Sequence, residues 1–140
     1  MAALTSYSSV DLFMSRGIHD RVSSVQGSNL DLPFRRQIDF WWAGFLLGVN
    51  SRATSPFEGD TVKFQDGSIF SSDPWRIVHL ELAALAIDGQ EALQNSSRVI
   101  AIAQSHANAG MRQILESLAG EARPVLTLIN EIDSLISKNE

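Results

Sequence analysis

The chain has 140 residues, no cysteine and a formal net charge of −5 at pH 7. This length is typical of one domain that buries its own core, and the lack of cysteine excludes disulfides, thiolate metal sites and cysteine nucleophiles. The 44% hydrophobic and 19% charged residues are typical of a globular protein and not of a disordered one. We therefore expect a single domain over residues 1–140.

The first thirty residues show weak patterning. Serines at 8–9 can cap a short helix over residues 10–14, which Gly17 would end or bend. Small polar residues and a glycine between 19 and 29 then predict an irregular link. We expect about 30 N-terminal residues to pack loosely.

The most apolar stretch predicts a helix over residues 33–49. From Phe40 to Val49 no polar side chain interrupts it, so the helix must be covered on every side and forms the centre of the core. These ten residues are about half of the ~20 that cross a bilayer, which argues against a membrane helix. Gly44 and Gly48 lie four positions apart, where another helix can approach closely.

Residues 61–71 predict a β-hairpin. Two segments of alternating polarity, 61–65 and 68–71, flank Asp66-Gly67, a dipeptide typical of two-residue turns. In this arrangement Phe64 pairs with Ile69 on the face turned towards the helices.

The next predicted helix begins at Asp73-Pro74, with the aspartate as N-cap, and ends at Gly89. It carries two stripes at helical spacing. The apolar stripe is expected to face the core and comprises Trp75, Val78, Leu82 and Leu85. The narrower and more polar stripe comprises Arg76, His79, Ala83 and Ala86.

A long helical pattern runs from about Gln90 to Ala119, and a last helix begins at Pro124. Asn108 and Gly110 have poor helix propensity and predict a kink or break in the long helix. The fold class that follows is mainly α. It has about five helices around the central apolar helix at 33–49, with one β-hairpin at 61–71.

Catalytic and metal-binding motifs are weak in this sequence. His19, His79 and His106 stand at none of the i, i+3 or i+4 spacings that place two ligands on one helical face. We find no glycine-rich phosphate loop, no nucleophile elbow and no paired-carboxylate motif. We expect no metal site, no cofactor and no catalytic residues. An enzyme whose site is dispersed along the sequence stays a third alternative.

Tryptophan and arginine are the residue types that most often anchor protein interfaces. The candidate interaction residues are Arg35, Arg36, Trp41, Trp42, Trp75, Arg76 and His79. The competing interpretation places the tryptophans in the core and the arginines in solvated helical turns.

These observations favour a non-enzymatic interaction or assembly subunit of a cytoplasmic, bacterial multi-protein system. The N-terminus lacks the basic and apolar regions of a secretory signal. Apolar residues between 100 and 136 exceed what one stripe needs, which predicts a homodimer through the C-terminal helices or a hetero-protein partner.

The alternative is a nucleic-acid-binding accessory protein. It would use the arginines of the N-terminal half, Arg16, Arg21, Arg35, Arg36 and Arg52. The net charge of −5 disfavours a phosphate-binding surface of any width.

Overall fold

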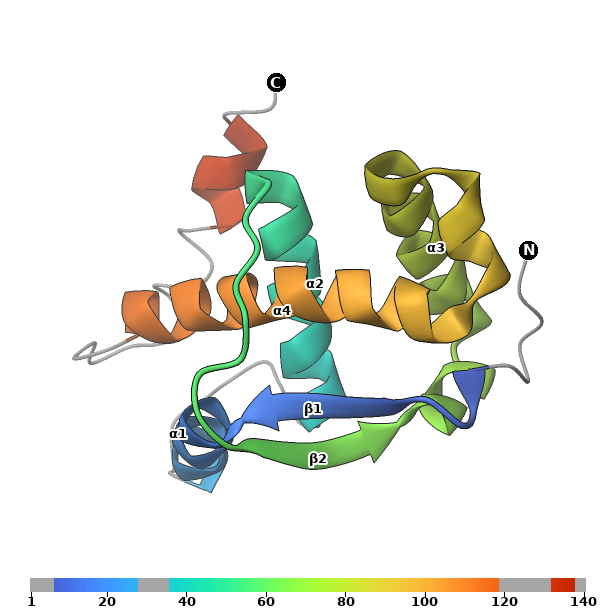
Figure 1. Ribbon diagram of the computed structural model, residues 1–140. Helices are drawn as coiled ribbons and strands as arrows, with labels where there is room; N and C mark the ends of the chain where they lie inside the picture. Colours follow the sequence, from blue (N-terminus) through green and yellow to red (C-terminus); the bar gives the residue numbers. More distant parts are fainter. Residues whose placement is uncertain (1–6, 28–35, 119–131, 138–140) are drawn as a thin grey trace.

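The computed structural model describes residues 7–27, 36–118 and 132–137. In chain order the elements are β1 (Asp11–Ser15), α1 (Arg16–Gly27), α2 (Gln37–Ser51), β2 (Thr61–Asp66), the 3₁₀ helix η2 (Gly67–Ser71), α3 (Pro74–Asp88), the 3₁₀ helix η3 (Gln90–Gln94) and α4 (Ser96–Leu118) (Figure 1). Residues 132–137 are also helical. The predicted mainly helical fold with one two-stranded antiparallel sheet is confirmed. Within these residues, no helix is both long and apolar enough to cross a membrane.

The centre of the fold is the crossing of α2 and α4, and Figure 1 shows α2 passing behind α4 there. A Cβ added to Gly110 would lie 1.7 Å from the carbonyl oxygen of Gly44, and one added to Gly48 would lie 2.1 Å from that of His106. The two backbones therefore touch where the glycines lie. The predicted close approach of a helix at Gly44 and Gly48 is confirmed.

Large apolar side chains fill the space around this crossing. Trp41 and Phe45 stack with ring centroids 6.0 Å apart, and both are buried. Leu80 of α3 and Met111 of α4 are buried completely in the same cluster. The helix predicted at 33–49 thus packs into the core, but it is not covered on every side as predicted, because Leu46 is 45% exposed. Residues 33–35 lie outside the described residues, and α2 spans Gln37–Ser51.

The helix α4 is continuous from Ser96 to Leu118, so the predicted kink at Asn108 and Gly110 is wrong. Gly110 is needed for contact with α2 and does not weaken the helix locally enough to break it. The start predicted at Gln90 is also wrong, because residues 90–94 form η3. The side chain of Asn95 then accepts a 2.9 Å hydrogen bond from the backbone N–H of Ser97 at the start of α4.

Buried polar side chains of α4 hold the extended segment at 53–58. Asn108 donates a 3.1 Å hydrogen bond to the carbonyl oxygen of Ser55. His106 Nδ1 lies 2.7 Å from the carbonyl oxygen of Ala53. These contacts satisfy polar groups that would otherwise be buried at a cost, and they assign His106 a structural role.

The sheet pairs β2 with the N-terminal β1 and not with residues 68–71. Met14 lies opposite Val62 in this antiparallel pair. Two predictions are therefore wrong: the strand β1 at 11–15 replaces the helix predicted over 10–14, and residues 68–71 belong to η2 and not to a strand.

Local chemistry explains why Asp66-Gly67 does not close a hairpin. The Asp66 carboxylate accepts a 3.0 Å hydrogen bond from the backbone N–H of Ser68 and so caps η2. Gly67 donates a 2.7 Å backbone hydrogen bond to Val10. A Cβ on Gly67 would lie 1.8 Å from the carbonyl oxygen of Tyr7, so the N-terminal segment occupies the space beside the turn.

Residues 16–27 form α1 where the sequence predicts an irregular link, and Gly17 lies in its first turn. Tertiary contacts outweigh the weak helix propensity of the small polar residues. Val22 of α1 is buried, and Tyr7, Leu12 and Met14 are buried completely. This described part of the N-terminal thirty residues therefore contributes to the core.

Candidate functional site

The helix α3 exposes the stripe that its sequence predicts to be buried. We call this stripe the α3 apolar face; it comprises Trp75, Val78, Leu82 and Leu85, which are 49%, 49%, 56% and 38% exposed. The side chains that α3 buries are Arg76, Ile77, Leu80, Glu81 and Ala84. The predicted orientation of this helix is wrong.

Polar partners from distant segments explain the orientation of α3. The hydroxyl of the buried Tyr7 donates a 3.0 Å hydrogen bond to the carboxylate of Glu81. Arg76 donates a 3.0 Å hydrogen bond to Asp39 of α2. These partners stabilise Arg76 and Glu81, which are 93% and 96% buried, and so favour burial of this side of α3.

Pro74 begins α3 as predicted, and Gly89 ends it with φ 80°. The side chain of Asp73 makes no capping hydrogen bond, so the N-cap prediction is wrong in that respect. Its carboxylate lies 3.9 Å from Nε of Arg76 instead.

Aromatic rings gather at the first turn of α3. Trp75 meets Trp42 of α2 edge to face, with ring centroids 5.6 Å apart, and His79 lies 5.8 Å from Trp75 and 6.2 Å from Trp42. The Arg76 guanidinium carbon is 5.1 Å and 5.2 Å from the two indole centroids. Trp42 is buried and Trp75 is half exposed, so this cluster has one side in the core and one in solvent.

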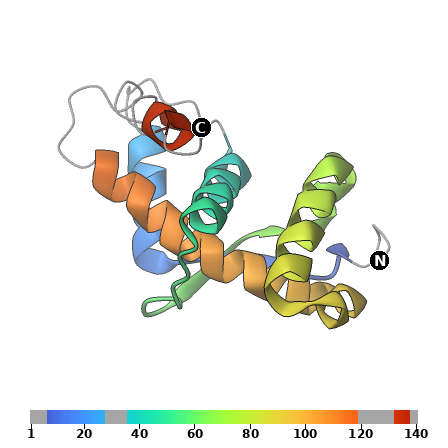
Figure 2. The same cartoon turned by 90° about the horizontal axis from the view of Figure 1, so that it is seen from above.

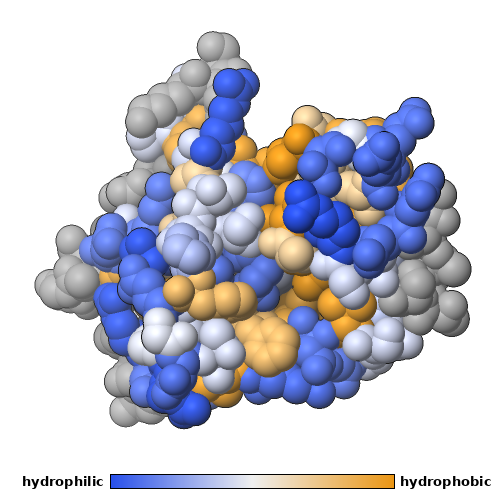
Figure 3. Space-filling view, in the orientation of Figure 1, coloured by the Kyte–Doolittle hydropathy of each residue, from blue (hydrophilic) through white to orange (hydrophobic). Residues whose placement is uncertain are grey.

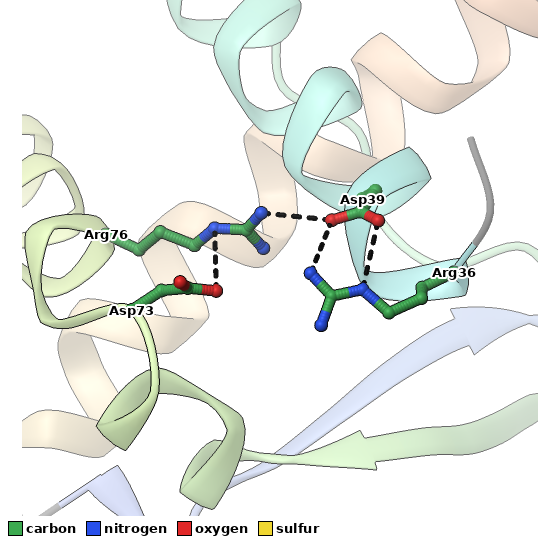
Figure 4. A network of polar contacts seen from close by, with 4 residues as sticks. All are labelled: Arg36, Asp39, Asp73 and Arg76. Atoms are coloured by element: carbon green, nitrogen blue, oxygen red, sulfur yellow. Dashed lines mark hydrogen bonds and ion pairs between the residues drawn. The ribbon is translucent and has the colours of Figure 1, made fainter. Parts of the chain in front are cut away.

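Two arginines share the carboxylate of Asp39, as Figure 4 shows. Arg36 donates two hydrogen bonds of 3.1 Å and Arg76 donates one of 3.0 Å. Burial by itself raises the pKa of Asp39, but the hydrogen bonds and positive charges of both arginines outweigh it, so this pKa lies below its ordinary value. Nε and Nη1 of Arg76 are buried without a hydrogen-bond partner among the described residues.

The structure brings together five of the seven candidate interaction residues, Arg36, Trp42, Trp75, Arg76 and His79. Trp41 is buried in the core, as the competing interpretation has it. Arg35 lies outside the described residues. Asp39 and Asp73 complete the network and were missed, although each is three positions from its arginine, a spacing at which helical side chains meet.

A hollow with an apolar surface lies between α2 and α3. The two helices rise side by side from α4 in Figure 2, and Figure 3 shows orange surface between them. Leu46 is 45% exposed and follows Trp42 by one helical turn, so it lies on the side of α2 that is turned towards α3.

The two ends of α3 differ in charge. The first turn is balanced, because two arginines face two aspartates there. At the far end lie Asp88 and the exposed Glu91, against one base, Arg98, which pairs with Asp88 at 2.9 Å. This pairing lowers the pKa of Asp88. Between the ends, the exposed surface of α3 has no charged side chain, since Arg76 and Glu81 are buried.

A second candidate region is a cavity of about 510 Å³ beside the first turn of α1. Its lining includes Arg21, Glu58, Arg112 and Glu116. Arg112 lies 2.7 Å from Glu58, and Arg21 donates a 3.2 Å hydrogen bond to a backbone carbonyl oxygen of α4. Its arginines are therefore engaged by the protein. No cluster of metal ligands occurs among residues 7–27, 36–118 and 132–137.

The four described arginines of the set considered for nucleic-acid binding do not form one continuous patch. Arg36 and Arg52 flank opposite ends of α2, on the order of 24 Å apart along the helix. Arg36 is engaged by Asp39. Arg16 and Arg21 lie on α1. Nucleic-acid binding stays a prediction, and the described residues show no surface that favours it.

Comparison with known proteins adds no assignment. No family model, curated protein or solved structure matches the chain. A functional proposal therefore depends on the geometry of α2 and α3.

Proposed function

We propose that the chain is a non-enzymatic interaction subunit of a cytoplasmic, bacterial multi-protein system, and that it docks a protein partner on the α3 apolar face. The observation that carries the proposal is the exposure of four large apolar side chains along one side of one helix. A single exposed leucine is ordinary on a protein surface, whereas a continuous apolar stripe marks a contact site.

The stripe does not result from a poorly packed helix. Opposite it, Ile77, Leu80 and Ala84 are buried in the core. The ring of Trp75 is held in place by Trp42 and Arg76 before any partner arrives. A fixed tryptophan loses little conformational entropy on binding, which makes it an effective anchor.

The exposed α3 apolar face favours the hetero-protein branch of our expectation over the homodimer through the C-terminal helices. Part of the apolar surplus that predicted the homodimer is covered within the chain: Ile100, Ile102, Ala103, Ala107, Met111 and Ile114 of α4 are all buried. Ile132 and Ile136 are exposed, so this homodimer stays a prediction.

Photo-cross-linking in cells of the source organism tests the proposal. A photoreactive amino acid replaces Leu82 in one variant and Phe57, which is also exposed but lies on the segment after α2, in the control. We expect a discrete adduct of higher mass from position 82 and none from position 57. The adduct should fall about tenfold in yield when Val78→Glu and Leu85→Glu are added, since both would place charge in the contact.

Three outcomes contradict the proposal. Absence of an adduct at position 82 would show that no partner contacts the α3 apolar face. Equal adducts from positions 57 and 82 would show that the contact is not specific to this face. An adduct at about twice the chain mass of 15.4 kDa replaces the hetero-partner with a second copy of the chain.

A further inference from the structure

The α3 apolar face has the shape that a single helix covers. Its four side chains stand at i, i+3, i+7 and i+10, the spacing at which one helix lies along another. The stripe from Trp75 to Leu85 is about 15 Å long, or roughly three helical turns. Leu46 of α2 is 45% exposed and lies on the side of α2 that is turned towards α3, so it adds apolar surface beside the stripe.

The exposed area also fits a helix better than a globular subunit. Four side chains that are each about half exposed offer on the order of a few hundred Å². A stable interface between folded subunits buries about 800 Å² on each partner. A second copy of the chain would therefore need contacts well beyond this stripe, whereas a segment of three or four turns would not.

Charge gives the face a direction. Among the described residues, the charges at its Trp75 end balance, since Arg36 and Arg76 pair with Asp39 and Asp73. At the Leu85 end, the charged residues that the structure describes are Asp88, Glu91 and one base, Arg98. The same end is the C-terminus of α3, where the last turn has no basic residue to offset the partial negative charge of the helix dipole.

We infer that the α3 apolar face binds an amphipathic helix of the partner whose basic residues lie over Asp88 and Glu91. The opposite end of this helix lies at Trp75 and carries no net charge. The inference rests on the proposed function, since it specifies the partner that the docking site takes. The acidic balance of residues 56–140, with six basic and twelve acidic side chains, strengthens the attraction at long range.

Selection from a displayed library tests this inference without knowledge of the partner. The probes are 16-residue peptides that have leucine or phenylalanine at helical spacing and are randomised elsewhere. Peptides are selected on the wild-type chain and counter-selected on Leu82→Glu, with Val78→Glu as a second counter-selection. Both variants should keep the wild-type melting midpoint, because the two side chains are exposed.

We expect the selected peptides to have an excess of lysine and arginine at one end only. For one such peptide, fluorescence anisotropy should show that Asp88→Lys with Glu91→Lys raises the dissociation constant at least tenfold. The control variant, Asp20→Lys with Glu116→Lys, makes the same change in net charge at exposed positions on α1 and α4, and it should change binding less than threefold. Equal losses from both double variants would mean that overall charge, and not this end of α3, attracts the peptide.

The outcomes separate this inference from the proposed function. Selected peptides that need Leu82 but carry acidic or evenly spread charge would contradict the inference of a basic end on the partner helix. They would still support the α3 apolar face as the docking site. A cross-linked partner at position 82 together with an empty selection overturns the helical form of the partner. Failure of both experiments removes the site itself.

Discussion

The α2–α4 crossing and the helix α3 use apolar residues in opposite ways. At the crossing, Gly44 and Gly110 bring two backbones into contact, and large side chains fill the space around them. Along α3, four large apolar side chains lie outside, while Arg76 and Glu81 lie inside and are held by Asp39 and Tyr7. Steric fit determines how α2 and α4 cross, whereas polar partners determine which side of α3 faces the core.

The difference shows which sequence patterns have a single structural meaning. Glycines four apart in an apolar run serve close backbone approach, and that use does not depend on knowing the partner. The apolar stripe of α3 does not determine which side of the helix is buried. Burial depends on which side finds partners in the rest of the fold. The pattern of α3 therefore predicted wrongly that Trp75 faces the core, since this side chain is 49% exposed.

The largest expected effect tests the crossing. Gly110→Ala should lower the free energy of unfolding by about 3 kcal/mol or more, because the new Cβ would lie 1.7 Å from a backbone oxygen that cannot move away cheaply. Gly17→Ala is the control: no atom lies within 4 Å of its added Cβ, and it should stabilise α1 by about 0.5–1 kcal/mol. Denaturant unfolding of both variants measures the contrast, and equal midpoints would show that α2 and α4 are not in backbone contact.

The next effect tests the orientation of α3 directly. Leu80 is completely buried and Leu82 is 56% exposed, although only two positions separate them. Leu80→Ala should cost about 2–5 kcal/mol through the cavity that it leaves. Leu82→Ala should change the stability by less than about 0.5 kcal/mol. Thermal unfolding compares the pair, and the reverse order of effects would restore the orientation that the sequence alone predicts.

The sequence predicts an element of this fold well when the residues that determine it are close together along the chain. The start of α3 at Pro74 and its end at Gly89 were predicted, because both signals are local. The strand β1 and the 3₁₀ helix η2 were not, since β2 finds its partner about fifty residues earlier in the chain and no local pattern encodes that pairing.

The residues of the candidate site were likewise predicted in part: some from their residue type, whereas one depends on a partner distant in the chain. Residue type alone identified Trp42, Trp75 and Arg76, because tryptophan and arginine are common in contact sites. Asp39 was missed, since an aspartate in the first turn of a helix is usually solvated. Its position 37 residues before Arg76 becomes informative only once α2 and α3 converge.

A third, smaller effect tests the polar partners of α3. Asp39→Ala leaves the buried guanidinium of Arg76 without its closest acceptor and should cost about 1–3 kcal/mol. Asp88→Ala removes an ion pair with Arg98 that is exposed on both sides, and little change in stability is expected. If the two aspartates prove equivalent in chemical denaturation, Asp39 does not orient α3.

The smallest expected effect is a dependence of stability on pH. It should distinguish the charged contacts of Asp39 from the steric contact at the α2–α4 crossing. Because the folded-state pKa of Asp39 lies below its ordinary value, its contribution is complete above about pH 4 and is lost as the pH falls through the folded pKa. The difference in stability between wild type and Asp39→Asn should therefore shrink in acid. Asp66 and Asp88, whose pKa values hydrogen bonds also lower, keep some acid dependence in that variant.

The effect of Gly110→Ala provides the reference for this measurement, since an overlap between a methyl group and a backbone oxygen has no charge to titrate. Unfolding free energies at pH 6, 4 and 2.5 for wild type and both variants should show a constant gap for Gly110→Ala and a narrowing gap for Asp39→Asn. If the Asp39→Asn gap stays constant down to pH 2.5, Asp39 acts through its shape and hydrogen bonds, and its negative charge contributes nothing to holding α3 against α2.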